Sequence, residues 1–354
     1  MTAIGHEEPD RVPVDYWAQP EVGERLRSHL GLSDHEHLLE RLGVDLRYVT
    51  GPSYAGQTLR SFDDGSEEDL WGVRRKPVTA EQGPYRWVYK HVVDSPLSRA
   101  ESAADVQRYE RWPSPDWWDY ASIAAECSAV GGHAVVNAGD RLDRTAQLKP
   151  MMYLRGMEQT YVDLIENPSI ADATIARIRD YFLEYNRRVF DSAAGGIDVF
   201  MMGDDFGTQH GPMMDLATWR RFFRDGFRRF IDLAHSYDIR VMHHTCGSVA
   251  SLIPEFIDAG LDILQSLQPR AAGMDLVALK REYGRDLAFH GSVDIQHVLP
   301  QGTPSAIRDH VARQMDAGKP GGGFIISTAH NIPPETPSEN IVALYEAYRE
   351  FGRY

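Results

Sequence analysis

The sequence predicts an α/β protein of the (β/α)8 barrel (TIM barrel) class, with a β-hairpin inserted near the N-terminus. Short apolar segments that end in polar residues alternate with segments of helical periodicity along most of the chain. Eight apolar segments can be counted, which is the strand number of this barrel, and its active sites lie at the C-terminal ends of the strands. Because 354 residues fit one barrel with insertions, we expect residues 1–354 to form a single domain.

The first two predicted strands are Arg11–Trp17 (RVPVDYW) and Gly43–Thr50 (GVDLRYVT), which are rich in Val, Tyr and Trp and are bounded by turn formers. Two β-rich segments joined by AEQGP follow, and they predict a hairpin insertion over Leu70–Val93. We expect this hairpin to shape or cover a site.

The other six predicted strands are continuous apolar runs, as in parallel sheets that are buried on both faces. They are His133–Gly139, Ile197–Asp205, Ile239–Gly247, Asp262–Pro269, Leu287–Asp294 and Phe324–His330. The segments between them have helical periodicity, and several end at glycine. The competing architecture is an open doubly wound sheet, but no Gly-rich fingerprint follows the first strand.

The composition argues against several classes of partner. The 37 Lys and Arg against 52 Asp and Glu give a formal charge of −15, which disfavours nucleic acid and anionic membranes. No apolar run approaches the roughly 18 residues of a membrane span, and the N-terminus lacks the order of a signal peptide, so we expect a cytoplasmic protein with a small-molecule substrate.

A candidate metal site lies in RVMHHTCG. Side chains two apart on a strand share a face, so His244 and Cys246 point together, and imidazole and thiolate are preferred zinc ligands. A catalytic zinc usually takes three protein ligands, and the third candidate is His330 at the end of the last strand, with His290 as its rival. A His and a Cys at this spacing also occur as an ordinary packing pair.

Further polar residues are expected at the same mouth. Of Asp204 and Asp205, one is expected to face the site as a general acid, general base or metal ligand, and the other to organise the turn. His290 shares a face with Ser292 and Asp294, which is typical either of an acid–base pair or of a buried hydrogen-bonded network. The predicted substrate-binding residues are Tyr16, Trp17, Gln209 and Gln265.

Several long motifs in order make the chain resemble the uroporphyrinogen decarboxylase superfamily, in the branch that includes the zinc-dependent corrinoid methyltransferases. The motifs are PDRVPVDYW, GDDFGTQHGPMM, HTCGSVASLIPEFIDAGLDIL, QPRAAGMDLVALKREYG, FHGSVDIQHVLPQGTP and GGGFIISTAHNIPPETPSEN. The resemblance implies that His244 and Cys246 bind zinc. It places His330 where those methyltransferases have a cysteine as third ligand.

This difference changes the expected chemistry. One thiolate and two imidazoles leave a zinc site with net positive charge, which favours Lewis-acid action on an oxygen substrate over thiol alkylation, and other divalent transition metals also suit such ligands. The RQAGR-type element of the true decarboxylases is absent. From the resemblance we therefore expect a metal-dependent methyltransferase or demethylase of a small molecule, with any corrinoid carried by a partner protein and zinc as the metal. The alternative is a metal-dependent lyase, hydrolase or decarboxylase of an oxygenated small molecule, without a corrinoid.

Overall fold

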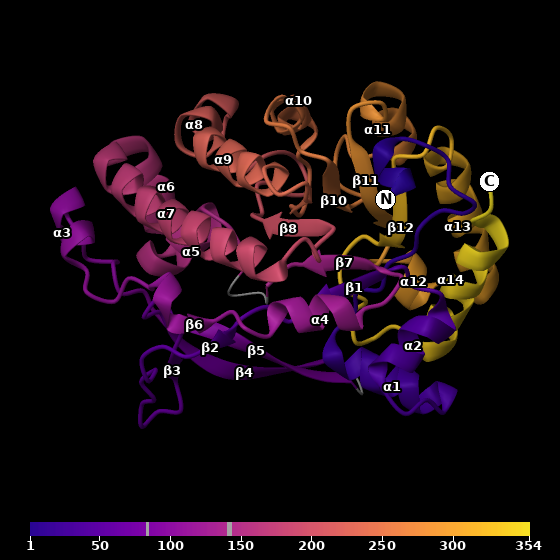
Figure 1. Ribbon diagram of the computed structural model, residues 1–354, viewed down its shortest axis with the longest axis horizontal. Helices are drawn as coiled ribbons and strands as arrows, with labels where there is room; N and C mark the ends of the chain where they lie inside the picture. The colour runs from indigo at the N-terminus through magenta and orange to yellow at the C-terminus, as the bar shows by residue number, and fades with distance from the viewer. Residues whose placement is uncertain (83–84, 140–143) are drawn as a thin grey trace.

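The computed structural model describes residues 1–82, 85–139 and 144–354. Its central sheet has seven strands in the order β1-β7-β8-β9-β10-β11-β12, and all neighbouring strands are parallel. These strands are β1 Leu46–Val49, β7 Ala134–Asn137, β8 Val199–Gly203, β9 Arg240–His244, β10 Ile263–Leu267, β11 Ala288–Val293 and β12 Phe324–Thr328. The sheet is curled and helices lie outside it, so the predicted barrel class is confirmed (Figure 1).

The helices occupy the segments between the strands. They are α1 Pro20–Leu30, α2 His35–Leu42, α3 Ala103–Arg108, α4 Ile123–Ala129, α5 Leu148–Arg155, α6 Met157–Glu166, α7 Pro168–Ala193, α8 Leu216–Phe222, α9 Arg224–His235, α10 Ile253–Asp258, α11 Leu276–Tyr283, α12 Val298–Gln301, α13 Pro304–Gly318 and α14 Ser338–Phe351. Side-chain oxygens of Asp215, Asp275 and Thr303 cap α8, α11 and α13. Among the described helices, none has the length and apolarity to span a membrane.

The first predicted strand, Arg11–Trp17, does not form a regular ladder, and that prediction was wrong in this respect. Val14 makes only an isolated parallel bridge to Ile326 of β12, because Pro13 lacks an N–H and the N–H of Val14 donates to the Asp45 carboxylate at 2.8 Å. On its other side the carbonyl of Val14 accepts the N–H of Asp45 at 2.8 Å. This extended segment therefore fills the eighth position, between β12 and β1.

The predicted insertion is an antiparallel hairpin of β4 Arg74–Gln82 and β5 Tyr85–Asp94, extended by β3 Glu67–Glu68. Residues 83 and 84 of its predicted turn lie outside the described residues. At its base, Arg75 pairs with Asp69 at 2.6 Å and lies over the ring of Tyr153 at 4.2 Å. A second antiparallel pair joins β2 Ser53–Tyr54 to β6 Trp118–Asp119.

The barrel interior changes from apolar to polar toward the carboxyl ends of the strands. Its apolar layers are a cluster that includes Leu46, Val136, Met201, Met242, Ile263, Ala288 and Ile325. Two residues further along their strands come Tyr48, His244, Gln265 and His290. Because side chains two apart share a face, the same alternation that builds the core places these polar groups at the mouth.

Candidate metal centre

Three predicted ligands meet at the mouth of the barrel. One ligand atom each of His244, Cys246 and His330 can be chosen so that all lie within 4.8 Å of one another. Nε2 of His244 lies 3.5 Å from Sγ of Cys246, and the rings of His244 and His330 are 5.5 Å apart. Strand β9 and the loop after it supply the first two residues, and the loop after β12 supplies the third.

Glycines allow the loops that follow β8 and β9 to pack closely. A Cβ added at Gly203 would lie 2.9 Å from Cβ of His244, and one added at Gly207 would lie 2.6 Å from the carbonyl oxygen of Cys246. Gly247 has φ +82 and would place a Cβ 2.6 Å from the backbone of Gly207. The position of Cys246 therefore depends on backbone contacts between two loops.

Two neighbours orient the imidazole of His244. Its Nδ1–H donates to Oε1 of buried Gln265, which leaves Nε2 unprotonated and directed at the cluster. The indole of Trp17 stacks against the same ring, with centroids 5.7 Å apart and planes 22° apart. Burial, then the charge of Arg144, hold the pKa of His244 well below its ordinary value, so the ring is neutral and can act as a ligand.

Asp205 is the carboxylate that faces the site. It pairs with Lys149, its Oδ1 lies 3.6 Å from Nε2 of His244, and it accepts the N–H of Cys246 at 3.2 Å. Burial opposes ionisation of Asp205, but the charge of Lys149 and the hydrogen bonds from Lys149 and the Cys246 N–H favour the carboxylate, so its pKa lies below the ordinary value. Burial and the charge of Asp205 raise the pKa of the Cys246 thiol to about 12, and a bound cation would displace its proton.

The three ligand atoms suit a divalent transition metal. One sulfur and two imidazole nitrogens form a three-ligand set of the kind that catalytic zinc uses, with a fourth position left for water or substrate. A metal-bound histidine usually donates its other ring N–H to an acceptor, and for His244 that acceptor is Oε1 of Gln265.

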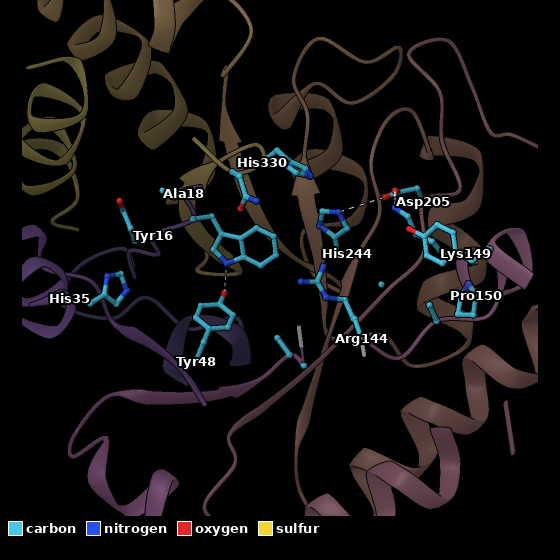
Figure 2. Close-up of a pocket in the computed structure, with 17 residues that line it drawn as sticks. Tyr16, Ala18, His35, Tyr48, Arg144, Lys149, Pro150, Asp205, His244 and His330 are labelled. Carbon is cyan, nitrogen blue, oxygen red and sulfur yellow. Dashed lines mark hydrogen bonds and ion pairs between the residues drawn. The ribbon is translucent and has the colours of Figure 1, made fainter. Parts of the chain in front are cut away.

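A cavity of about 380 Å³ opens beside His244 and His330 of this cluster (Figure 2). Its lining residues are Tyr16, Trp17, Ala18, His35, Tyr48, Ala138, Gly139, Arg144, Ala146, Lys149, Pro150, Tyr153, Gly203, Asp205, His244, His330 and Asn331. Two predicted substrate-binding residues, Tyr16 and Trp17, are among them. The guanidinium of Arg144 lies 5.3 Å from the ring of Trp17, which brings a cation to this wall.

Asp204 does not face the cavity. Its carboxylate accepts the backbone N–H groups of Gln147, Leu148 and Lys149 at 2.6 to 2.8 Å, where α5 begins. Burial raises the pKa of Asp204 to about 6, against the effect of these N–H donors. Of the two adjacent carboxylates, the structure therefore brings Asp205 to the site, while Asp204 anchors the start of α5.

His290 lies in the barrel interior and not at the cavity wall. It is fully buried, and its Nε2 lies 2.8 Å from Oδ2 of Asp15. The predicted wall with Asp294 is not formed because the strand is irregular there: Ser292 has φ 80, and Asp294 turns to accept the N–H of Gln296 at 2.7 Å. The carboxylate that contacts this histidine thus comes from the N-terminal segment.

The other two predicted substrate-binding residues also lie away from the cavity lining. Gln209 is exposed, and its carbonyl accepts the N–H of Ala272 at 3.0 Å. Gln265 is buried behind His244, so it contacts the candidate metal centre through that ring. His243 points away from the mouth, as alternation predicts, and packs among Phe227 and other rings.

Sequence reasoning missed Asp15, His35, Arg144 and Lys149. Arg144 and Lys149 follow β7, so their position after a strand was an available signal. Asp15 gave no such signal because it lies within the N-terminal segment, and His35 begins a helix.

The comparisons place the chain in a family. The sequence model of uroporphyrinogen decarboxylase (URO-D) matches residues 146–351, so the chain belongs to this family. It is 24% identical over 209 residues to a methylated-thiol–coenzyme M methyltransferase of Methanosarcina mazei, covering 58% of this chain and 52% of the relative. It is also 24% identical over 201 residues to a uroporphyrinogen decarboxylase of Nostoc punctiforme, covering 55% of this chain and 52% of the relative.

The matched regions thus span about half the length of these curated relatives. A solved methyltransferase from Methanosarcina mazei has the same fold, with a TM-score of 0.64 and 18% identity over 99% of this chain and 97% of that chain.

Proposed function

We propose that this protein is a metal-dependent methyltransferase that removes a methyl group from a small molecule and passes it to a corrinoid carried by a partner protein. The observation that carries the proposal is the convergence of His244, Cys246 and His330, two of which, His244 and His330, line one cavity. Membership of the uroporphyrinogen decarboxylase family and the similarity to a methyltransferase support it.

His244, Cys246 and His330 would hold the metal, with zinc as the expected ion. When bound, the metal would supply Lewis acidity beside the cavity. With one thiolate and two neutral imidazoles this site keeps a net positive charge, which favours a donor whose methyl group is attached to oxygen. In such a reaction the methyl–oxygen bond breaks, a methyl–cobalt bond forms on a cob(I)alamin-type corrinoid, and the released oxygen takes a proton.

The residues of the chain have separate tasks in this proposal. Trp17 and Tyr16 form an aromatic wall against which a small donor packs. Lys149, which pairs with Asp205 at the cavity, is the ammonium group placed to provide the proton. Asp205 keeps this ammonium in place.

The test is a methyl-transfer assay with cob(I)alamin as acceptor. Metal-loaded protein is supplied with methyl ethers, methyl thioethers and quaternary methylamines, and methylcobalamin formation is followed by absorbance. We expect turnover of a methyl ether, and its loss in the His244→Ala/Cys246→Ala variant. Cys127→Ala is the matched control, because Cys127 lies on α4 and outside the cluster.

Two results would contradict the proposal. Breakdown of an oxygenated substrate without any corrinoid would favour the lyase, hydrolase or decarboxylase alternative. Full activity in protein from which a chelator has removed the metal would contradict both candidate functions, since both depend on a metal.

A further inference from the structure

A chain of hydrogen bonds runs from the half-buried cavity wall into the buried barrel interior. The indole Nε1–H of Trp17 donates to the hydroxyl oxygen of Tyr48 at 2.7 Å. The Tyr48 hydroxyl in turn donates to Oδ2 of Asp15 at 2.7 Å, and Nε2 of His290 lies 2.8 Å from the same oxygen. The other oxygen of Asp15 accepts the N–H of Tyr16 at 2.7 Å.

The directions of these bonds follow from the groups involved. The Oδ2 oxygen of Asp15 accepts the hydroxyl proton of Tyr48, which fixes the direction of that bond. The lone pairs of the Tyr48 oxygen are then available to the indole N–H, which has no other role than donor. Asp15 therefore determines how Tyr48 is oriented, and Tyr48 determines where the indole of Trp17 lies.

Trp17 connects this chain to the candidate metal centre. Its indole stacks on one face of the His244 ring, while Gln265 holds the Nδ1 side of the same ring. With the ring plane and one nitrogen both fixed, Nε2 of His244 has little freedom to leave the cluster.

The inner end of this chain of hydrogen bonds is fully buried. Asp15 and His290 are both 0% exposed. Burying a carboxylate is costly unless it is paired and hydrogen-bonded, and apolar side chains would fill the same space without that cost. A buried polar network can impose one specific arrangement of side chains, and the network here connects through Tyr48 and Trp17 to the ring of His244.

We infer that Asp15, Tyr48 and Trp17 are positioning residues for the metal centre, acting through the ring of His244. The inference rests on the proposed metal site. Residues that support a metal-bound histidine typically change metal affinity by about 10- to 100-fold when they are replaced.

The test is a double-mutant cycle on zinc affinity, measured by competition with a chromogenic chelator. We expect Tyr48→Phe and Trp17→Phe each to weaken zinc binding by about tenfold, the lower end of that range. The double variant should bind about as tightly as either single one, because both substitutions remove the same hydrogen bond. The visible spectrum of the Co²⁺-substituted protein should shift in all three variants, while the unfolding midpoint stays near wild type.

Tyr120→Phe is the matched control, because it removes a tyrosine hydroxyl that donates to the Pro115 carbonyl at 2.8 Å, away from the cavity lining. Wild-type affinity in Tyr48→Phe, or losses that add in the double variant, would overturn the inference while the metal site stands. Failure of the wild-type protein to bind zinc or cobalt would overturn the proposed function and this inference together.

Discussion

In the proposed function, His330 is the ligand that most directly sets the type of chemistry at this site. It stands where the resemblance to zinc-dependent methyltransferases places a cysteine, and the structure brings it to His244 and Cys246. Strand ends and alternation pointed to His244, Cys246 and His330, with His290 as the rival for the third position, and the resemblance matched that position to His330. It could not show that Asp15, and not Asp294, would contact His290, because that contact depends on how the N-terminal segment closes the barrel.

Replacing His330 with cysteine should separate metal binding from turnover. The variant should keep about one metal ion per chain, because a thiolate at this position can bind zinc at about 2.3 Å. The extra negative charge lowers the Lewis acidity of the site. Turnover of a donor whose methyl group is attached to oxygen should therefore fall by about tenfold or more. Metal analysis and the methyl-transfer assay measure both quantities.

The control for this variant is His210→Cys, which adds a thiol at an exposed loop position outside the cluster. It should retain wild-type turnover. Loss of the metal in His330→Cys would mean that His330 is not placed to act as a ligand, and increased turnover would favour thiol alkylation as the natural reaction.

At the scale of elements, seven strands lie within the ranges predicted from apolar runs. The two places where the prediction failed have local causes. Pro13 and the Asp45 carboxylate prevent a ladder in the first segment. In β11, Gly291 and Ser292 have positive φ and the register with β10 shifts, so strict alternation does not extend to Asp294.

The loops after β8 and β9 pack closely against each other and so fix the position of Cys246. A substitution at Gly207 tests this packing. In Gly207→Ala the new Cβ would meet the backbone of Cys246 and Ser248 at 2.6 and 2.8 Å, so the loops must move apart. We expect a loss of about 1–3 kcal/mol in the free energy of unfolding, together with weaker metal binding. Urea unfolding and chelator competition provide the two measurements.

Gly211→Ala is the matched control within the same loop, since nothing lies within 4 Å of its added Cβ. If Gly207→Ala bound zinc as tightly as Gly211→Ala, close packing of these loops would not be needed to place Cys246.

On the scale of the whole molecule, barrel closure makes the site. Asp15 and His290 are 275 positions apart in sequence but share a hydrogen bond, because the N-terminal segment lies beside β12. The order of strands was predictable from the sequence, since strands and helices alternate along it. The residues of the cavity wall were harder to predict from the sequence, because helices and connecting segments, and not strand ends alone, contribute His35, Arg144 and Lys149 to it.

The central claim is that the barrel mouth holds a metal ion, and anomalous diffraction at the zinc absorption edge tests it most directly. Crystals of the full chain, purified with zinc in the medium, should give one strong anomalous peak per chain. We expect that peak between Nε2 of His244, Sγ of Cys246 and a ring nitrogen of His330, at about 2.0–2.1 Å from nitrogen and 2.3 Å from sulfur. A peak elsewhere with none at these atoms, or no peak in zinc-supplied protein, would contradict the account.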